Sequence, residues 1–347
     1  MIELFKPIAP QDKWHPVFKM LMDPSNRPEQ QVLEAWAEGF EDRDGKFVYE
    51  FQTTFESCMW ELYLHACLKE LGTTINLKHH APDFVVDGPT KFCMEATIAA
   101  PAVGEQPPIG YDPRELPKDF NLFNSQAAIR LTNSLTSKLA KYRKSYCKLP
   151  HVQGRPFVIA VAPFDRAFSH FAVNRPIVAA LYGVHYDEEA AIAMGPSAKE
   201  IPRIDVSGAI KPNGASVPMG LFCDGQNKEI SAVVFSTVAS WGKIRALADK
   251  PHGKFIFRTL HPAKSGLKPE VRVATKANYR EHLLDGLHVF HNPFAEFPLT
   301  PDTLAHERIA QFILDGEEVE EVAPHDFLLM RMVQAIIERD EEGNLVP

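Results

Sequence analysis

The chain has 347 residues, of which 45% are hydrophobic and 24% are charged, and its formal net charge is −8. This composition is normal for a soluble globular protein and excludes a disordered or fibrous chain. No apolar run approaches the ~20 residues of a membrane span, and the first residues lack the pattern of a signal peptide. The five cysteines include no CxxC pair, which disfavours a disulfide framework and indicates a reducing, cytoplasmic compartment.

The first part of the chain predicts helices followed by short strands. Residues 1–50 read as a helical lead-in with proline breaks and without a motif. A strong helix is predicted over Thr54–Leu71, because apolar residues recur there at helical spacing and Gly72 supplies a stop. Three β-prone segments follow, at Thr73–Lys78, Ala81–Val86 and Lys91–Ile98.

A long loop and a second helix follow these strands. The loop, Ala99–Asp119, holds five prolines and is placed to act as a flap over a substrate. Asn121–Lys144 predicts a helix with a leucine stripe on one side. Pro156–Ala162 is a continuous apolar run, which is typical of a strand buried on both faces. The predicted order is therefore helix, three strands, helix, strand.

The remaining sequence gives weaker signals. We expect a helix over Ala167–Tyr182, strands at Ser231–Ser236 and Lys254–Thr259, and a C-terminal helix around Phe327–Glu338. The organisation this predicts is a lead-in (1–50), an α/β core (51–165) and a C-terminal extension of the sheet and helices (166–347).

The charges are unevenly distributed along the chain. The net negative charge disfavours nucleic acid as a partner, but no Asp or Glu occurs between Phe120 and Phe164. A local basic surface attracts phosphate even on an acidic protein. The basic residues of the second helix that we consider for nucleic-acid binding are Arg130, Lys138, Lys141, Arg143 and Lys144. The plainer interpretation is the solvated side of an amphipathic helix.

The second and third strands form a hairpin with two acidic residues. A three-residue loop, Gly88 to Thr90, sets Asp83 opposite Glu95, with their Cβ atoms ~4.5–5.5 Å apart. The same register puts the apolar residues of both strands on the other face. Opposed carboxylates repel each other, and a bound Mg²⁺ is one way to neutralise them. The alternative is a hairpin whose acids simply face water.

The segments Pro82-Asp83-Phe84 and Met94-Glu95-Ala96-Thr97, in this order of elements, resemble the PD-(D/E)XK nuclease superfamily. The resemblance covers about residues 51–162. It implies a restriction-endonuclease-like αβββαβ core, in which a mixed central sheet is flanked by helices. It also implies that Asp83, Glu95 and the carbonyl of Ala96 bind Mg²⁺ or Mn²⁺.

A glutamate on the preceding helix often completes the metal site in that superfamily. This helix has two, Glu56 and Glu61, which point roughly 140° apart, so at most one faces the hairpin. We prefer Glu61, whose distance from Gly72 resembles the spacing in the archaeal Holliday-junction resolvase branch. Glu56 is the other candidate ligand, or a charge at the helix start.

Thr97 stands where the superfamily has a lysine. Three accounts are open: the lysine comes from another element, metal and water suffice, or the site has decayed. Lys138 fits the first account best, because it borders the leucine face of the second helix, and Lys141 and Arg130 are second choices. His79 and His80 are interpreted as structural.

The sequence therefore predicts a metal-dependent nuclease acting on DNA or possibly RNA, with no membrane partner and with a homodimer as one possibility. The alternative from a different class is a catalytically inactive protein of the same fold that binds nucleic acid or another protein. Thr97 and the acidic net charge favour that alternative.

Overall fold

The computed structural model describes residues 2–101, 112, 114, 116–195, 200–211, 213–264, 267–315, 318–336, 338–339 and 345–346. The predicted flap over residues 99–119 lies largely outside the described residues. Within the described ranges the five cysteines are free, and none of the helices has the length and apolar composition of a membrane span.

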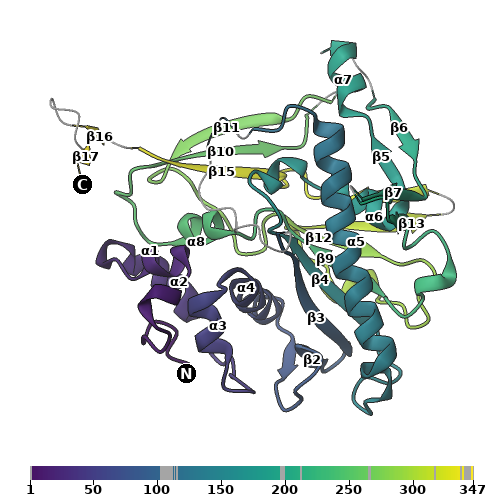
Figure 1. Cartoon of the computed structure of the whole chain (residues 1–347), viewed down its shortest axis with the longest axis horizontal. Coiled ribbons are helices and arrows are strands. Elements are labelled where there is room, and N and C mark those ends of the chain that lie inside the picture. Colours follow the sequence, from purple (N-terminus) through teal and green to yellow (C-terminus); the bar gives the residue numbers. More distant parts are fainter. Residues whose placement is uncertain are drawn as a thin grey trace.

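The centre of the protein is a mixed sheet, in which the described residues form eight strands in the order β1-β2-β3-β4-β9-β12-β13-β14 (Figure 1). β1 to β3 are antiparallel neighbours, and β3, β4 and β9 run parallel. Their bounds are Thr74–Asn76 (β1), Phe84–Asp87 (β2), Phe92–Ala99 (β3), Phe157–Pro163 (β4), Ala232–Phe235 (β9), Leu287–His291 (β12), Ile309–Asp315 (β13) and Glu318–Val322 (β14). The sheet thus joins strands from before and after residue 165.

Two long helices cover opposite faces of this sheet. Helix α5 (Phe120–Lys144) lies lengthwise across one face in Figure 1, and α4 (Glu56–Glu70) packs on the other. β4 shows why the predicted strand is apolar throughout: Val158, Ala160 and Ala162 face the α4 side, whereas the alternate residues face the α5 side. The predicted order of helix, three strands, helix and strand is observed.

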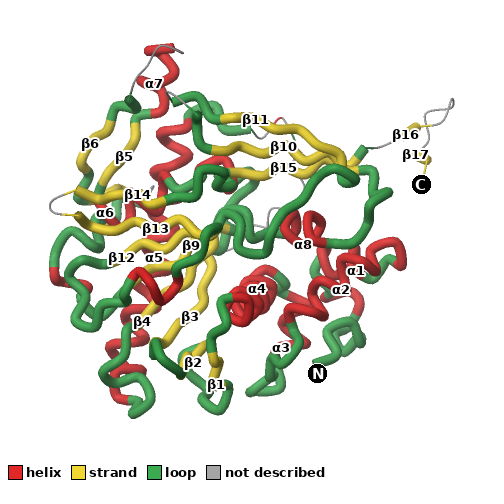
Figure 2. The backbone as a smooth tube through the Cα atoms, turned by 180° about the vertical axis from the view of Figure 1, so that it is seen from behind, coloured by secondary structure: helices red, strands yellow, loops and turns green. Residues whose placement is uncertain are grey.

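Helix α4 is buried nearly all round, because the N-terminal helices cover its outer side (Figure 2). These are α1 (Pro16–Leu21), α2 (Arg27–Trp36) and α3 (Phe47–Thr53), with 3₁₀ turns at Gln11–Lys13 and Pro24–Asn26. Aromatic contacts join the layers, including Trp36 against Tyr63 and Phe51 against Phe55. The helical lead-in predicted for residues 1–50 is therefore confirmed, and it closes one side of the core.

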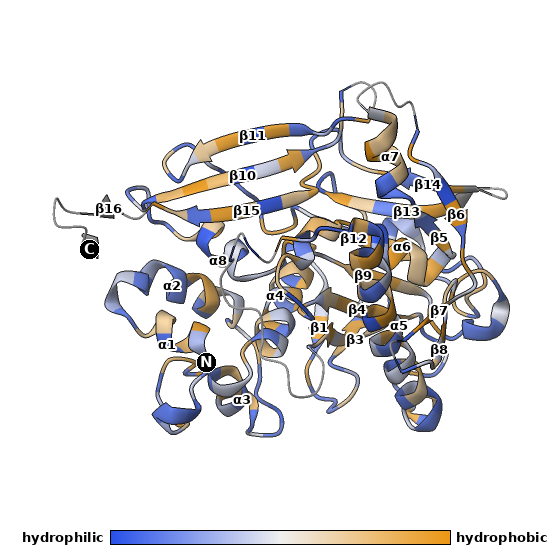
Figure 3. Cartoon of the chain, turned by 45° about the horizontal axis from the view of Figure 1, so that its top comes forward, coloured by the Kyte–Doolittle hydropathy of each residue, from blue (hydrophilic) through white to orange (hydrophobic). Residues whose placement is uncertain are grey.

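A second, three-stranded sheet lies beside the central one, in the order β11-β10-β15. In this sheet (Figure 3), β10 (Phe255–His261) alternates buried and more exposed residues, as expected for a strand buried on one face, whereas the exposed positions of β11 (Glu270–Thr275) include Val271 and Val273. β15 is Met330–Ala335, so the predicted helix around Phe327–Glu338 is wrong. Pairing of β15 with β10 overrides the helical propensity of this segment.

The other C-terminal elements are short. The predicted helix over Ala167–Tyr182 is divided into a 3₁₀ turn and α6, and the two predicted strands correspond to β9 and β10. The remaining bounds are Ser169–Ala172 (η5), Arg175–Tyr182 (α6), Val184–Tyr186 (β5), Glu188–Met194 (α7), Arg203–Asp205 (β6), Gly208–Ile210 (β7), Ser216–Pro218 (β8), Gly225–Asn227 (η7), Trp241–Leu247 (α8), Pro301–Leu304 (η8), Glu338–Arg339 (β16) and Leu345–Val346 (β17).

Candidate active site

The hairpin β2–β3 has the predicted register. Phe84 lies opposite Met94 and Val86 opposite Phe92, so the same register carried one residue further puts Asp83 opposite Glu95. Phe84, Val86, Phe92 and Met94 are buried in the core on the α4 side. The alternation of a strand therefore turns Glu95 to the α5 side, as the sequence predicts.

Glu95 is fully buried and is surrounded by donors from α5 and the turn after it. Its Oε1 lies 2.7 Å from Lys138 Nζ and 3.1 Å from Lys141 Nζ, and it accepts a 3.1 Å hydrogen bond from the Tyr146 hydroxyl. Its Oε2 is buried and has no hydrogen-bond partner among the described residues. The predicted position of Lys138 beside the hairpin is confirmed, and one carboxylate oxygen of Glu95 is left without a donor.

Lys138 reaches Glu95 because of the phase of α5. Leu131, Leu135 and Leu139 are buried against the sheet, and Lys138 lies at the border of that face. Its side chain is 23% exposed, whereas that of Lys141 is 51% exposed. Lys138 therefore forms the more buried of the two ion pairs.

Asp83 is held by the main chain of the neighbouring strand. Its Oδ2 accepts a 2.7 Å hydrogen bond from the Ala96 N–H. The N–H and C=O of one strand residue point to the same side, so the Ala96 carbonyl also faces the Asp83 side. The ladder between β2 and β3 ends at the pair Phe84–Met94, and Pro82, which precedes Asp83, has no N–H to donate to this carbonyl. Asp83, Glu95 and the Ala96 carbonyl thus offer acceptors in one place.

Glu61 is the helix glutamate that belongs to this site. Its charge and that of Asp83 act on each other, and the Arg43 guanidinium lies 3.8 Å from its Oε1. Arg43 also donates to the carbonyls of His79 and Pro82, on either side of the cis bond between Ala81 and Pro82. Arg43 therefore ties Glu61 to the chain that leads into Asp83.

The site raises the pKa of two of its acids. Burial raises the pKa of Glu61 to about 8, the charge of Asp83 adds to the rise, and Arg43 opposes it. Burial raises the pKa of Asp83 to about 6, with a further rise from Glu95, while Lys138 and the Ala96 N–H oppose it. Burial, followed by the charge of Glu95, also raises the pKa of Tyr146. A cation entering the site therefore displaces protons.

Other predicted residues lie elsewhere. Glu56 begins α4 and lies 3.2 Å from His15 Nε2, so the contact that the structure gives it is with α1 and not with the hairpin. Arg143, predicted to bind nucleic acid, is paired with Glu229 at 2.8 Å. Thr97 shares the face of Glu95 by strand alternation.

Three predicted basic residues line up along α5. Lys141 reaches Glu95, and Lys144 is exposed in the last turn. Arg130 lies eight residues before Lys138, about 12 Å along the helix axis, and its charge acts on Asp165 instead. Lys138 and Lys141 are thus the predicted basic residues that contact the carboxylates.

Two residues of the site escaped the sequence analysis. Arg43 lies in a segment where no motif was recognised, and nothing in its neighbours indicates its position. Tyr146 lies in the 3₁₀ turn Tyr146–Lys148 that follows α5, so the helical spacing of α5 does not predict its contact with Glu95.

The site offers few ligands for a metal ion. Among the described residues, no three His, Cys, Asp or Glu side chains are grouped so that they could hold a metal. Mg²⁺, however, is commonly bound by one or two carboxylates and keeps several waters. Asp83, the unpartnered Oε2 of Glu95 and the Ala96 carbonyl fit that smaller set.

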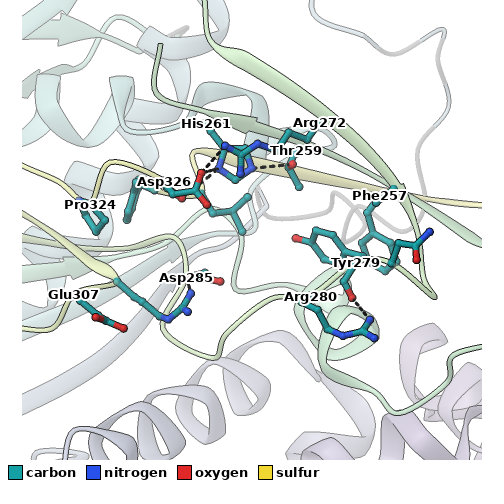
Figure 4. A pocket seen from close by; sticks show the side chains of 15 residues that line it. Phe257, Thr259, His261, Arg272, Tyr279, Arg280, Asp285, Glu307, Pro324 and Asp326 are labelled. Atoms are coloured by element: carbon teal, nitrogen blue, oxygen red, sulfur yellow. Dashed lines mark hydrogen bonds and ion pairs between the residues drawn. The ribbon is translucent and has the colours of Figure 1, made fainter. Parts of the chain in front are cut away.

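A cavity of about 470 Å³ beside the second sheet is the other polar cluster (Figure 4). Its charges neutralise one another: Asp326 pairs with Arg272 at 2.5 Å and with His261 at 3.6 Å, and Arg308 pairs with Asp285 at 3.0 Å. Figure 4 shows His261, Arg272 and Asp326 turned toward each other. These pairs hold five of the cavity's charged side chains to one another, while Arg280 donates to the main-chain carbonyls of Ala277 and Tyr279.

Comparisons of the chain with protein-family models, with curated proteins and with solved structures found no match.

Proposed function

We propose that this protein is a metal-dependent nuclease with a PD-(D/E)XK-type core. The observation that carries the proposal is the buried Glu95 carboxylate, set opposite Asp83 across a hairpin and met at 2.7 Å by Lys138 from the following helix. The order α4-β1-β2-β3-α5-β4, in which β4 is parallel to β3, supports the restriction-endonuclease-like core. Asp83 precedes β2 and Glu95 lies within β3, as the resemblance requires.

Asp83, Glu95 and the Ala96 carbonyl would hold Mg²⁺ or Mn²⁺, with Glu61 nearby. The bound metal supplies a more acidic water and stabilises negative charge on the scissile phosphate. Asp83 keeps its orientation through the Ala96 N–H, and Glu95 keeps its orientation through Lys138 and Tyr146. These contacts fix both carboxylates before any substrate arrives.

Lys138 takes the role of the motif lysine, whose position in the sequence is occupied by Thr97. Its ammonium group is next to Glu95, where it orients the attacking water or donates a proton to the leaving oxygen. Lys141, more exposed, is available to a phosphate of the backbone. DNA is the preferred substrate, RNA is the other, and the location in the cell is expected to be the cytoplasm.

The second candidate function is a protein that binds nucleic acid or another protein without cleaving. One observation favours it: Lys138 and Lys141 already neutralise Glu95 without a metal. In that case the cluster is a structural ion pair, and divalent cations have no effect on the protein.

The test is cleavage of plasmid DNA, single-stranded DNA and RNA by the purified protein with Mg²⁺, Mn²⁺ or a chelator. We expect cleavage that depends on the metal and disappears in Asp83→Asn and Glu95→Gln. The matched control is Asp87→Asn, which removes a carboxylate from the same hairpin that is paired with Arg155 and Asn76. The proposal of a metal-dependent nuclease is rejected if Asp83→Asn still cleaves, or if Mg²⁺ and Mn²⁺ change the cleavage of none of the substrates.

A further inference from the structure

A second cavity, of about 830 Å³, lies apart from the carboxylates. Its walls include the residues that directly follow two neighbouring parallel strands, Phe164 after β4 and Ser236 and Thr237 after β9. In open α/β sheets, ligands bind outside the carboxyl ends of such strands. The volume is within the range of small-molecule sites.

Five aromatic side chains line this cavity, which we call the strand-end cavity. They come from three parts of the chain: α4 and its start, the segment after β4, and α8. They are Phe55, Phe164, Phe168, Phe171 and Trp241. Such a wall suits a flat, apolar body.

Two of these aromatic residues are held in an unusual backbone conformation. Phe55 has φ 33° and Phe168 has φ 61°, and residues other than glycine adopt positive φ infrequently. Strained backbone of this kind costs about 1–3 kcal/mol and is found most often at binding and active sites. The fold therefore maintains these two side chains in the wall at an energetic cost.

The charges of the wall are unbalanced. Its residues include Arg166, Arg245 and Arg331 but one carboxylate, Glu56, which lies against His15. Arg166 and Arg331 have carboxylate partners at 2.5 and 2.6 Å. None of the ion pairs formed by the described residues includes Arg245.

Arg245 is instead surrounded by apolar groups. Its guanidinium lies 5.1 Å from the ring centre of Trp241 and 4.6 Å from that of Phe255, and one nitrogen is 3.6 Å from the sulfur of Met20. The Nε of Arg245, the Nε of Arg331 and the Nε1 of Trp241 are buried without an acceptor among the described residues. A buried donor without a partner costs about 1–3 kcal/mol. These three donors are enclosed by side chains, so a ligand acceptor would reach them only after the wall of the cavity shifts.

We propose that the strand-end cavity binds a small organic anion, whose aromatic body packs on the phenylalanines and whose acidic group pairs with Arg245. The proposal does not depend on the nuclease site, because none of the carboxylates of that site lines the cavity. The strand-end location, the aromatic wall and the cation without a carboxylate all favour this class of ligand.

The test uses a matched pair of fluorescent probes, anionic 8-anilinonaphthalene-1-sulfonate and uncharged N-phenyl-1-naphthylamine, titrated into the folded protein. We expect one anionic probe bound per chain. Arg245→Gln is expected to lower the affinity for the anionic probe at least tenfold and the affinity for the uncharged probe less than threefold. Competition with adenosine 5′-monophosphate and with benzoate then distinguishes a phosphate from a carboxylate as the acidic group.

Two further variants keep the test decisive. Trp241→Phe replaces the indole by a smaller aromatic ring without an N–H, and it is expected to weaken binding of the anionic probe more than binding of the uncharged one. Arg175→Gln, at an arginine paired with Glu188 outside the cavity, is the charge control and should bind as the wild type. Unchanged affinity of the anionic probe in both Arg245→Gln and Trp241→Phe, or an equal loss for both probes, overturns the proposal.

Discussion

Replacing Lys138 by methionine tests whether the lysine has a chemical role or only a structural one. Methionine keeps most of the length and apolar stem of the side chain and removes the ammonium group 2.7 Å from Glu95. In the metal-free protein this leaves a buried carboxylate with Lys141 and Tyr146 as its remaining partners. Both a loss of stability and a loss of cleavage are expected.

The size of each loss follows from the exposure of the partners. Breaking a fully buried ion pair costs about 3–5 kcal/mol. Lys138 is 23% exposed and Lys141 still contacts the same oxygen, so we expect a smaller loss of about 1–3 kcal/mol in the free energy of unfolding. A group that transfers a proton or orients water contributes about 10²–10⁴-fold to a rate, which sets the expected fall in cleavage.

Urea denaturation with and without Mn²⁺, together with cleavage rates, measures both effects. Mn²⁺ is expected to recover part of the stability lost in Lys138→Met, because a cation that binds only the folded protein stabilises it. The control is Lys141→Met, which removes a more exposed ammonium from the same oxygen and should cost less than about 1 kcal/mol. Wild-type cleavage by Lys138→Met would refute a catalytic lysine. A loss of stability that Mn²⁺ does not change would favour the structural ion pair.

Three further predictions concern the same region. The raised pKa values of Asp83 and Glu61 mean that the folded protein binds more protons than the unfolded chain. The free energy of unfolding should therefore fall as pH rises from about 4 to about 8, by up to about 1.4 kcal/mol per pH unit for each proton. Denaturation of the metal-free protein at several pH values measures this fall, and Glu61→Gln should make it smaller. Tyr146→Phe removes one hydrogen bond to a charged acceptor and should destabilise the protein by about 1.5–3 kcal/mol in urea, and no change would exclude that bond. Arg143→Gln should leave the affinity for a labelled oligonucleotide unchanged in fluorescence anisotropy, because Glu229 already pairs with this arginine; a tenfold weakening contradicts that account.

The elements near the hairpin were predictable because local patterns determine them. Alternation of apolar residues and a three-residue loop gave the register of β2 with β3, and the leucine spacing of α5 placed Lys138 at the border of the buried face. Both patterns act over a few residues, and the burial of one strand face penalises any slip by one residue. Helix geometry predicts that Glu56 and Glu61 point in different directions, and Glu56 indeed contacts His15.

What escaped prediction depends on contacts between distant segments. Arg43 joins the site through carbonyls 36 and 39 residues away in sequence, and no local pattern reports such a contact. Met330–Ala335 has residues that suit a helix, but it pairs with β10 more than seventy residues earlier. The strand-end cavity likewise arises where α4, β4, β9 and α8 meet, so its arginines have no sequence signal in common.

The position of Lys138 explains how a threonine can stand at residue 97 without leaving the site uncharged. Residue 97 shares the face of Glu95 but is about 7 Å further along the strand, and α5 runs over that face with Lys138 one turn from Lys141. Lys138 approaches the Glu95 carboxylate from the helix that covers this face of the sheet. A second lysine, at position 97, would place another ammonium group on the same face. The double variant Thr97→Lys, Lys138→Met separates the two arrangements. Cleavage restored above that of Lys138→Met alone would show that the ammonium group matters and the element that carries it does not.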